Sequence, residues 1–88
     1  MNSSRYTVRF TKPAVKELSK VSRQVQERVR DAIDDLEREP RPPGVTKLSG
    51  EADLYRIRVG DYRVIYSIQD DVLLVLIIRI GNRRDVYR

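Results

Sequence analysis

Apolar residues recur along the chain with two periods, which predict one strand, two helices and three further strands. Residues 6–10 alternate between apolar and polar, as in a half-buried strand. Over residues 12–36, apolar residues recur every three or four positions, the spacing of helices that bury one side. Alternation returns over residues 55–68, and the stretch "VLLVLII" at 72–78 is apolar throughout. The chain therefore changes from helical to extended structure near its middle.

Polar and proline residues mark the ends of these elements. Thr11 precedes Pro13 at the start of the first helical pattern, where Thr can cap a helix and Pro fits its first turn. Ser22 can cap the second helix in the same way. The segment "EPRPPG" at 39–44 ends the helical pair, because its prolines remove backbone donors. Asp70 and Asp71 mark the turn before the last strand.

The stretch "YRIRVGDYRVIYSI" predicts a β-hairpin closed by the two residues Gly60 and Asp61. In that register Arg58 faces Arg63, and side chains alternate between the two faces of the sheet. One face then carries the apolar and tyrosine side chains and packs against the helices: Tyr55, Ile57, Val59, Tyr62, Val64 and Tyr66. The other face carries three cations: Arg56, Arg58 and Arg63. We call these three residues the arginine face.

The last strand is expected to run from Val72 to about Ile80 and to end at a break at Gly81 and Asn82. Because it is apolar on both faces, it should be central and covered. Strict alternation puts Arg79 on the side facing the helices, outside the arginine face. The expected fold is one α+β domain over residues 1–88, with an N-terminal strand, an antiparallel helical pair and a three-stranded antiparallel meander that carries the helices on one face.

Charge and composition narrow the function. The chain has 18 Lys and Arg against 13 Asp and Glu, a formal net charge of +5, which favours a polyanionic partner. No lysine follows Lys47, so the cations of the second half are arginines. The planar guanidinium group of arginine can donate two hydrogen bonds to one phosphate. The chain has neither Cys nor His. It therefore lacks thiols, the usual general base and the commonest metal ligands. We therefore expect no metal site and no cofactor.

The apolar stretches are too short for a signal peptide or a membrane span, so a cytoplasmic protein with no membrane partner is expected. Three cations on one face repel one another, by a few tenths of a kcal/mol or more for a directly opposed pair, and a phosphodiester would relieve that repulsion. A solvated sheet face is the alternative. Arg41, within the proline segment, and Lys47, just after it, could extend the basic surface, although ordinary loop charges are more common.

The quoted hairpin stretch, with "KLSG" before it and "IGNRRDVYR" after the last strand, resembles the RelE/ParE superfamily of toxins over essentially the whole chain. The resemblance implies the RelE-like fold. RelE-type members cut messenger RNA in the decoding site of the ribosome, and ParE-type members act on DNA gyrase. The pair formed by Arg83 and Tyr87 favours the RelE-like branch, an endoribonuclease that needs no metal.

By position, the resemblance assigns a catalytic role to three residues: Arg63 beside the phosphate, Arg83 near the leaving oxygen, and Tyr87 beside the attacking 2′-hydroxyl. The resemblance assigns contacts with the RNA backbone to Arg56 and Arg58. Basic charge and place in the chain predict RNA binding for Arg84 and Lys47 as well. Relatives often carry lysines at the positions of Arg56 and Arg58, and a histidine or lysine at that of Asn82. The implied partners are a cognate antitoxin protein and the ribosome with mRNA in its decoding site. A ParE-like gyrase inhibitor and a non-catalytic RNA-binding module stay open as alternatives.

Overall fold

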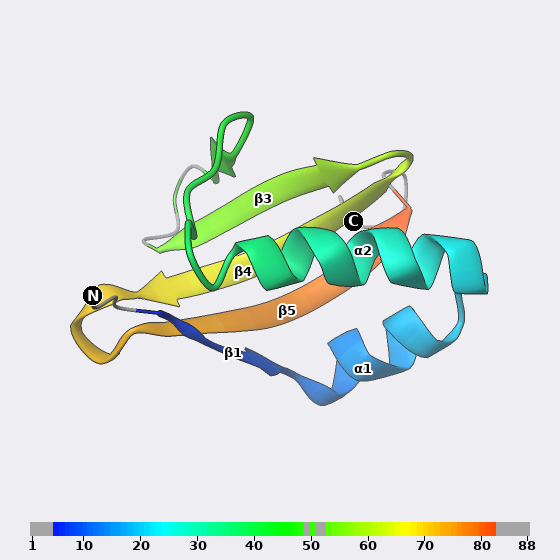
Figure 1. The fold of residues 1–88 in the computed structure, drawn as a ribbon, viewed down its shortest axis with the longest axis horizontal. Helices are drawn as coiled ribbons and strands as arrows, with labels where there is room; N and C mark the ends of the chain where they lie inside the picture. Colours follow the sequence, from blue (N-terminus) through cyan, green and yellow to red (C-terminus); the bar gives the residue numbers. More distant parts are fainter. Residues whose placement is uncertain (1–4, 49, 51–52, 83–88) are drawn as a thin grey trace.

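The computed structural model describes residues 5–48, 50 and 53–82 and shows two helices on one face of a five-stranded sheet (Figure 1). In chain order the elements are β1 (Thr7–Phe10), α1 (Lys12–Ser19), α2 (Arg23–Asp35), β2 (Thr46–Lys47), β3 (Leu54–Val59), β4 (Tyr62–Gln69), a 3₁₀ turn (Asp70–Val72) and β5 (Leu74–Asn82). The predicted α+β fold, with a strand, two helices and a three-stranded meander, is confirmed.

The order of the strands in the sheet is β1-β5-β4-β3-β2. β5 is central, as predicted, and β1 lies beside it in parallel, with Thr7 opposite Leu74 and Phe10 opposite Ile77. β2 is a two-residue strand on the far edge that the sequence pattern does not predict, because two residues show no period. β5 also continues through Gly81 and Asn82, so the predicted break at these residues is wrong.

Both predicted helix caps are present. The Thr11 hydroxyl accepts a hydrogen bond from the Ala14 amide at 3.2 Å, and the Ser22 hydroxyl accepts one from the Val25 amide at 3.3 Å. Each cap satisfies one of the amide groups that a helix start leaves without an intrahelical partner. The Thr11 hydroxyl also donates to the Ile78 carbonyl oxygen at 2.8 Å, so the start of α1 is held against β5.

A β-bulge changes the alternation within β5. Ile65 of β4 lies opposite Arg79, but the next residue, Tyr66, lies opposite Ile77, which leaves Ile78 as an extra residue. Ile80 consequently takes the core position, and Arg79 is exposed. The predicted position of Arg79 is therefore wrong. Its guanidinium forms an ion pair with the Glu17 carboxylate of α1 at 2.7 Å.

The core lies between the helices and the sheet. α1 and α2 contribute Ala14, Leu18, Val29 and Ile33, with Leu36 just after α2, and the sheet contributes Tyr55, Ile57, Val64, Tyr66, Ile68, Val75, Ile77 and Ile80. Tyr55 and Tyr66 stack with ring centroids 6.0 Å apart, and Tyr62 is partly buried, so the tyrosines serve packing as predicted. On the other face of β5, Leu74, Leu76 and Ile78 are only half-buried, so the expectation that both faces are covered is not met.

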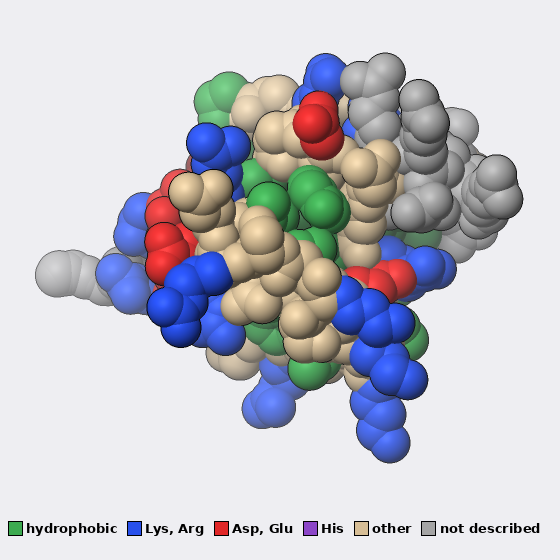
Figure 2. Space-filling model, turned by 90° about the vertical axis from the view of Figure 1, so that its right-hand side faces the viewer, with side chains coloured by type: hydrophobic (Ala, Val, Ile, Leu, Met, Phe, Trp, Pro, Cys, Tyr) green, Lys and Arg blue, Asp and Glu red, His purple; other side chains and the backbone are tan. Residues whose placement is uncertain are grey.

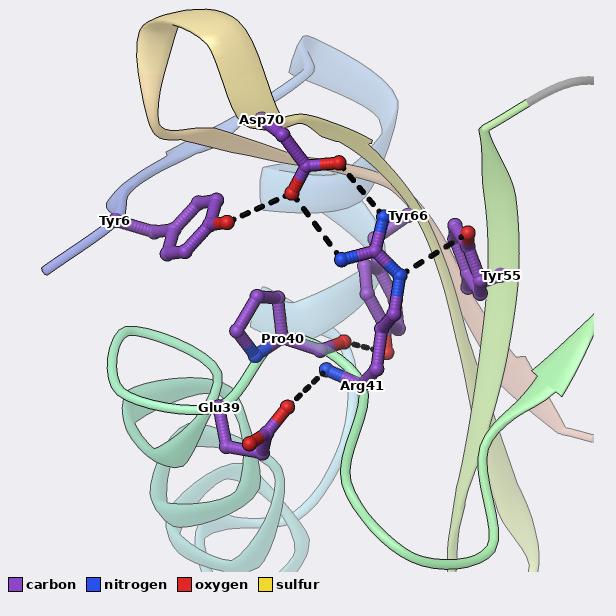
Figure 3. A network of polar contacts seen from close by, with 7 residues as sticks. All are labelled: Tyr6, Glu39, Pro40, Arg41, Tyr55, Tyr66 and Asp70. Atoms are coloured by element: carbon purple, nitrogen blue, oxygen red, sulfur yellow. Dashed lines mark hydrogen bonds and ion pairs between the residues drawn. The ribbon is translucent and has the colours of Figure 1, made fainter. Parts of the chain in front are cut away.

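Arg41, within the proline segment, is part of a polar network that reaches the turn before β5 (Figure 3). Its Nη1 and Nη2 atoms donate to the two Asp70 oxygens at 3.1 and 2.8 Å, and its Nε donates to the Tyr55 hydroxyl at 3.2 Å. The Tyr6 hydroxyl donates to the same carboxylate at 2.7 Å, and the buried Tyr66 hydroxyl donates to the Pro40 carbonyl oxygen. Arg41 thus joins the proline segment to the turn before β5 and does not extend the basic surface.

The Asp70 carboxylate gives this network a pH dependence. Hydrogen bonds from Arg41 and then Tyr6 lower the pKa of Asp70 to about 2, against an ordinary value of 3.8. A lowered folded-state pKa means that the carboxylate stabilises the fold fully above the ordinary pKa, and that this contribution is lost as the pH falls towards 2.

Asp70→Asn should lower the thermal unfolding midpoint at pH 7, because the amide cannot pair with the guanidinium, and the difference from wild type should vanish near pH 2. Circular dichroism melts over this pH range measure both. Asp71→Asn is the matched control, since Asp71 makes no hydrogen bond or ion pair within the described residues. An equal difference at pH 7 and pH 2 would contradict the assignment.

Candidate nucleic-acid interface

The β3–β4 hairpin forms in the register that the sequence predicts. Val59 lies opposite Tyr62, Arg58 opposite Arg63, and Arg56 opposite Ile65. The pair that closes a two-residue hairpin is hydrogen-bonded, so the next pair, Arg58 and Arg63, is of the non-hydrogen-bonded kind, in which side chains stand closer. The three arginines therefore leave the sheet on the same face, opposite the helices, as expected.

The three arginines differ in exposure. Arg58 is exposed, whereas Arg56 and Arg63 are half-buried. On the β5 side of Arg63 the opposing residue is Gly81, so β5 places no side chain directly beside it. The charge of a half-buried arginine is screened less by solvent than that of an exposed one, so Arg56 and Arg63 are better placed than Arg58 to act strongly on a bound anion.

Lys47 does not belong to the arginine face. It lies opposite Tyr55, whose side chain faces the core, and the residue opposite Arg56 is Thr46. Because side chains directly opposite one another share a face, the Lys47 side chain starts on the other side of the sheet. Lys47 is exposed at the sheet edge, and its contact with RNA stays a prediction. The sequence does not predict β2, so it gives no register for Lys47.

The described chain ends close to the arginine face. Asn82, its last residue, lies opposite Tyr62, one position from the pair formed by Arg63 and Gly81. Arg83, Arg84 and Tyr87 lie outside the described residues, so their roles stay predictions. Figure 2 shows this end of the molecule, where Lys and Arg side chains form several groups around a centre of backbone and apolar atoms.

Within the part of the chain that the structure describes, no group of three or more His, Cys, Asp or Glu side chains is arranged to hold a metal ion. Neither described helix is long and apolar enough to span a membrane. The arrangement that stands out chemically is the pair of opposed guanidinium groups on β3 and β4. Such donors can bind phosphate oxygens in pairs.

The chain is similar to known toxins over nearly its whole length. Residues 8–87 match the family described as ParE toxin of type II toxin-antitoxin system, parDE. Toxin RelG of Mycobacterium tuberculosis is 38% identical over 84 residues, covering 94% of this chain and 97% of RelG. The mRNA interferase toxin RelE of Escherichia coli is 30% identical over 80 residues, covering 89% of this chain and 83% of RelE.

The fold is similar to that of solved toxin structures. The archaeal RelE in the RelE-RelB complex from Pyrococcus horikoshii superposes with a TM-score of 0.82 at 37% identity, covering 92% of this chain and 98% of that one. The fold and these matches define a toxin of a type II toxin-antitoxin system. The chain belongs to the RelE/ParE toxin superfamily and is RelE-like, which confirms the resemblance found in its sequence.

Proposed function

We propose that this toxin is an endoribonuclease that cuts messenger RNA on the ribosome. The observation that carries the proposal is the pair of opposed arginines, Arg58 and Arg63, on the sheet face away from the helices. Further support comes from the E. coli relative, named an mRNA interferase, at 30% identity. The substrate we propose is an RNA strand whose backbone crosses the arginine face.

The proposed reaction uses the substrate's own 2′-hydroxyl group. Its oxygen attacks the adjacent phosphorus, the bond from phosphorus to the 5′-oxygen breaks, and the products are a 2′,3′-cyclic phosphate and a 5′-hydroxyl. Negative charge builds on the non-bridging oxygens, where Arg63 donates hydrogen bonds. Arg56 and Arg58 hold the neighbouring phosphates. No step of this reaction requires a metal ion or a cofactor.

Two proton transfers complete the proposed reaction, and the residues assigned to them come from the family resemblance. Tyr87 takes the proton of the 2′-hydroxyl, and nearby guanidinium groups favour its phenolate form. The leaving 5′-oxygen takes its proton from solvent water and becomes the 5′-hydroxyl, while Arg83 stabilises the negative charge that develops on it. Because arginine is a poor acid near neutral pH, much of the rate is expected to come from positioning of the mRNA in the ribosomal decoding site.

The proposed physiological partner is an antitoxin that neutralises the toxin. Solved relatives from P. horikoshii, M. tuberculosis and E. coli are toxin–antitoxin complexes. We expect an acidic helix or extended segment of the antitoxin to cover the arginine face, because the chain carries a net charge of +5.

The ends of the cleaved RNA test the proposal. Purified toxin is added to ribosomes programmed with a defined mRNA, and the same mRNA free of ribosomes is the comparison. We expect cuts on the ribosome that leave 2′,3′-cyclic phosphate and 5′-hydroxyl ends. Uncut mRNA on ribosomes, or cuts that leave 5′-phosphate ends, would contradict the proposal.

A second candidate is inhibition of DNA gyrase, because the matching family model is described as ParE. A supercoiling assay with purified gyrase separates the two functions. We expect no inhibition at toxin concentrations that cut ribosome-bound mRNA, and an early stop of translation rather than DNA damage in cells that express the toxin.

Salt dependence tests whether the arginine face binds RNA backbone. Arg58→Ala should make the slope of log binding constant against log salt concentration less negative by about 0.7, the value for one lost phosphate contact on a single strand. Binding of a single-stranded RNA over a salt series measures it. Arg30→Ala, on the helix side of the molecule, is the matched control and should leave the slope unchanged. Equal slopes in the Arg58 variant and wild type would remove Arg58 from the interface.

A further inference from the structure

A hollow of about 350 Å³ lies beside Arg58, between α2, the proline segment and β3. Its wall includes Ala32 and Asp35 of α2, Pro42 and Pro43 of the proline segment, and Ile57 and Arg58 of β3. Its volume is at the lower end of the range for small-ligand sites, roughly 300–1,000 Å³. Arg58 belongs both to this wall and to the arginine face, so the hollow adjoins the proposed RNA interface.

The backbone of β3 is open at this edge. The Leu48 amide donates to the Leu54 carbonyl oxygen at 3.0 Å, so the Leu54 backbone faces β2. Backbone groups of an edge strand point alternately to its two sides, so those of Arg56 and Arg58 face the same way as those of Leu54. β2 lies opposite only Tyr55 and Arg56, so no strand of the described chain pairs with Arg58 on this side. An amide donor and a carbonyl acceptor are thus available beside the hollow.

The charge of the wall favours a nucleobase over a phosphate. Asp35 contributes a carboxylate, which repels phosphate but accepts hydrogen bonds from the amino group of a base. Its Oδ1 already accepts from Arg38 at 2.8 Å, and a carboxylate has lone pairs for further donors. The rings of Pro42 and Pro43 offer apolar surface to the flat face of a base. A base bound here would place its sugar and phosphate towards Arg58.

Building on the proposed function, we propose that this hollow binds one base of the mRNA next to a phosphate held by Arg58. Asp35 selects a base with an exocyclic amino group, which donates to its carboxylate. The backbone amide and carbonyl of Arg58 meet the polar edge of the same base. The toxin itself would then contribute to sequence preference beside the cut.

The experiment compares bases that differ only by the amino group. At each position beside the cut, one mRNA carries guanosine and a second carries inosine, which lacks the amino group. A second pair of mRNAs carries adenosine or purine riboside, which lacks the amino group. Single-turnover cleavage rates on ribosomes are measured for each mRNA. At one position we expect removal of the amino group to slow wild-type toxin about tenfold. Asp35→Asn should lose this response. Ala32→Leu, which narrows the hollow, should weaken it.

Asp34→Asn is the matched control, because Asp34 is the neighbouring carboxylate of α2 and lines a separate groove facing β1 and α1. It should respond to the amino group as wild type does. An Asp35→Asn variant that cuts and responds like wild type would overturn the base subsite and leave the nuclease standing. The base subsite would also be overturned if the only effect of Asp35→Asn were weaker binding to the antitoxin. If wild-type toxin cuts none of the mRNAs, the nuclease itself fails.

Discussion

Arg63→Ala should slow single-turnover cleavage of ribosome-bound mRNA by roughly 100- to 1,000-fold, the usual effect of removing one preorganised donor to a developing oxyanion. Arg63 is half-buried, lies opposite Arg58 and has Gly81 on its other side. Its guanidinium therefore acts where solvent screens it less than at an exposed site. Rates measured at saturating toxin separate this loss from weaker RNA binding.

Growth of cells that express the variant gives a second readout. The Arg63 variant should relieve growth arrest, whereas Arg30→Ala, an arginine on the helix side, should arrest growth as wild type does. Arg63→Lys keeps one charge but not the forked donors, so an intermediate rate is expected. Melting curves show whether each variant is folded. Wild-type cleavage by a folded Arg63→Ala protein would exclude Arg63 from catalysis.

Ile77→Ala should cost about 3 kcal/mol of unfolding free energy, because it deletes buried methyl and methylene groups and leaves a cavity. Ile77 is 0% exposed and lies between Phe10 of β1 and Tyr66 of β4. For a domain of this size the thermal midpoint should fall by roughly 15 °C. Chemical and thermal denaturation of the purified toxin measure both quantities.

Ile78→Ala is the matched control, the same substitution one residue further along β5. Ile78 is the extra residue of the bulge and is only half-buried, so it leaves less of a cavity. Its cost should be less than half that of Ile77→Ala. Similar costs at the two positions would mean that both faces of β5 are equally covered.

The hairpin could be predicted because its determinants are local. A two-residue turn at Gly60 and Asp61 fixes which residues of β3 and β4 lie opposite each other, and strict alternation then assigns every side chain to a face. Gly60 has a φ of +60°, a backbone conformation that glycine adopts without strain. The arginine face of the site follows from this register alone.

Other features depend on contacts between distant segments, which no local pattern contains. The bulge at Ile78 is held by Thr11, 67 positions away in the sequence, and it decides the position of Arg79. Arg41 has the sequence context of a loop charge, yet Asp70 and Tyr55 bind it. β2 is too short to show a period in the sequence. The face of the sheet to which the Lys47 side chain belongs therefore follows only from its pairing with Tyr55.

The parallel pairing of β1 with β5 has a consequence for how the toxin is made. Residues 7–10 of β1 pair with residues 74–77 of β5. The helices can therefore form early in synthesis, whereas β1 cannot pair until β5 has been made. A chain abandoned before codon 74 lacks the central strand, and an isolated hairpin is at best marginally stable in water. A chain that stops before codon 74 therefore cannot complete the sheet on which the arginine face lies.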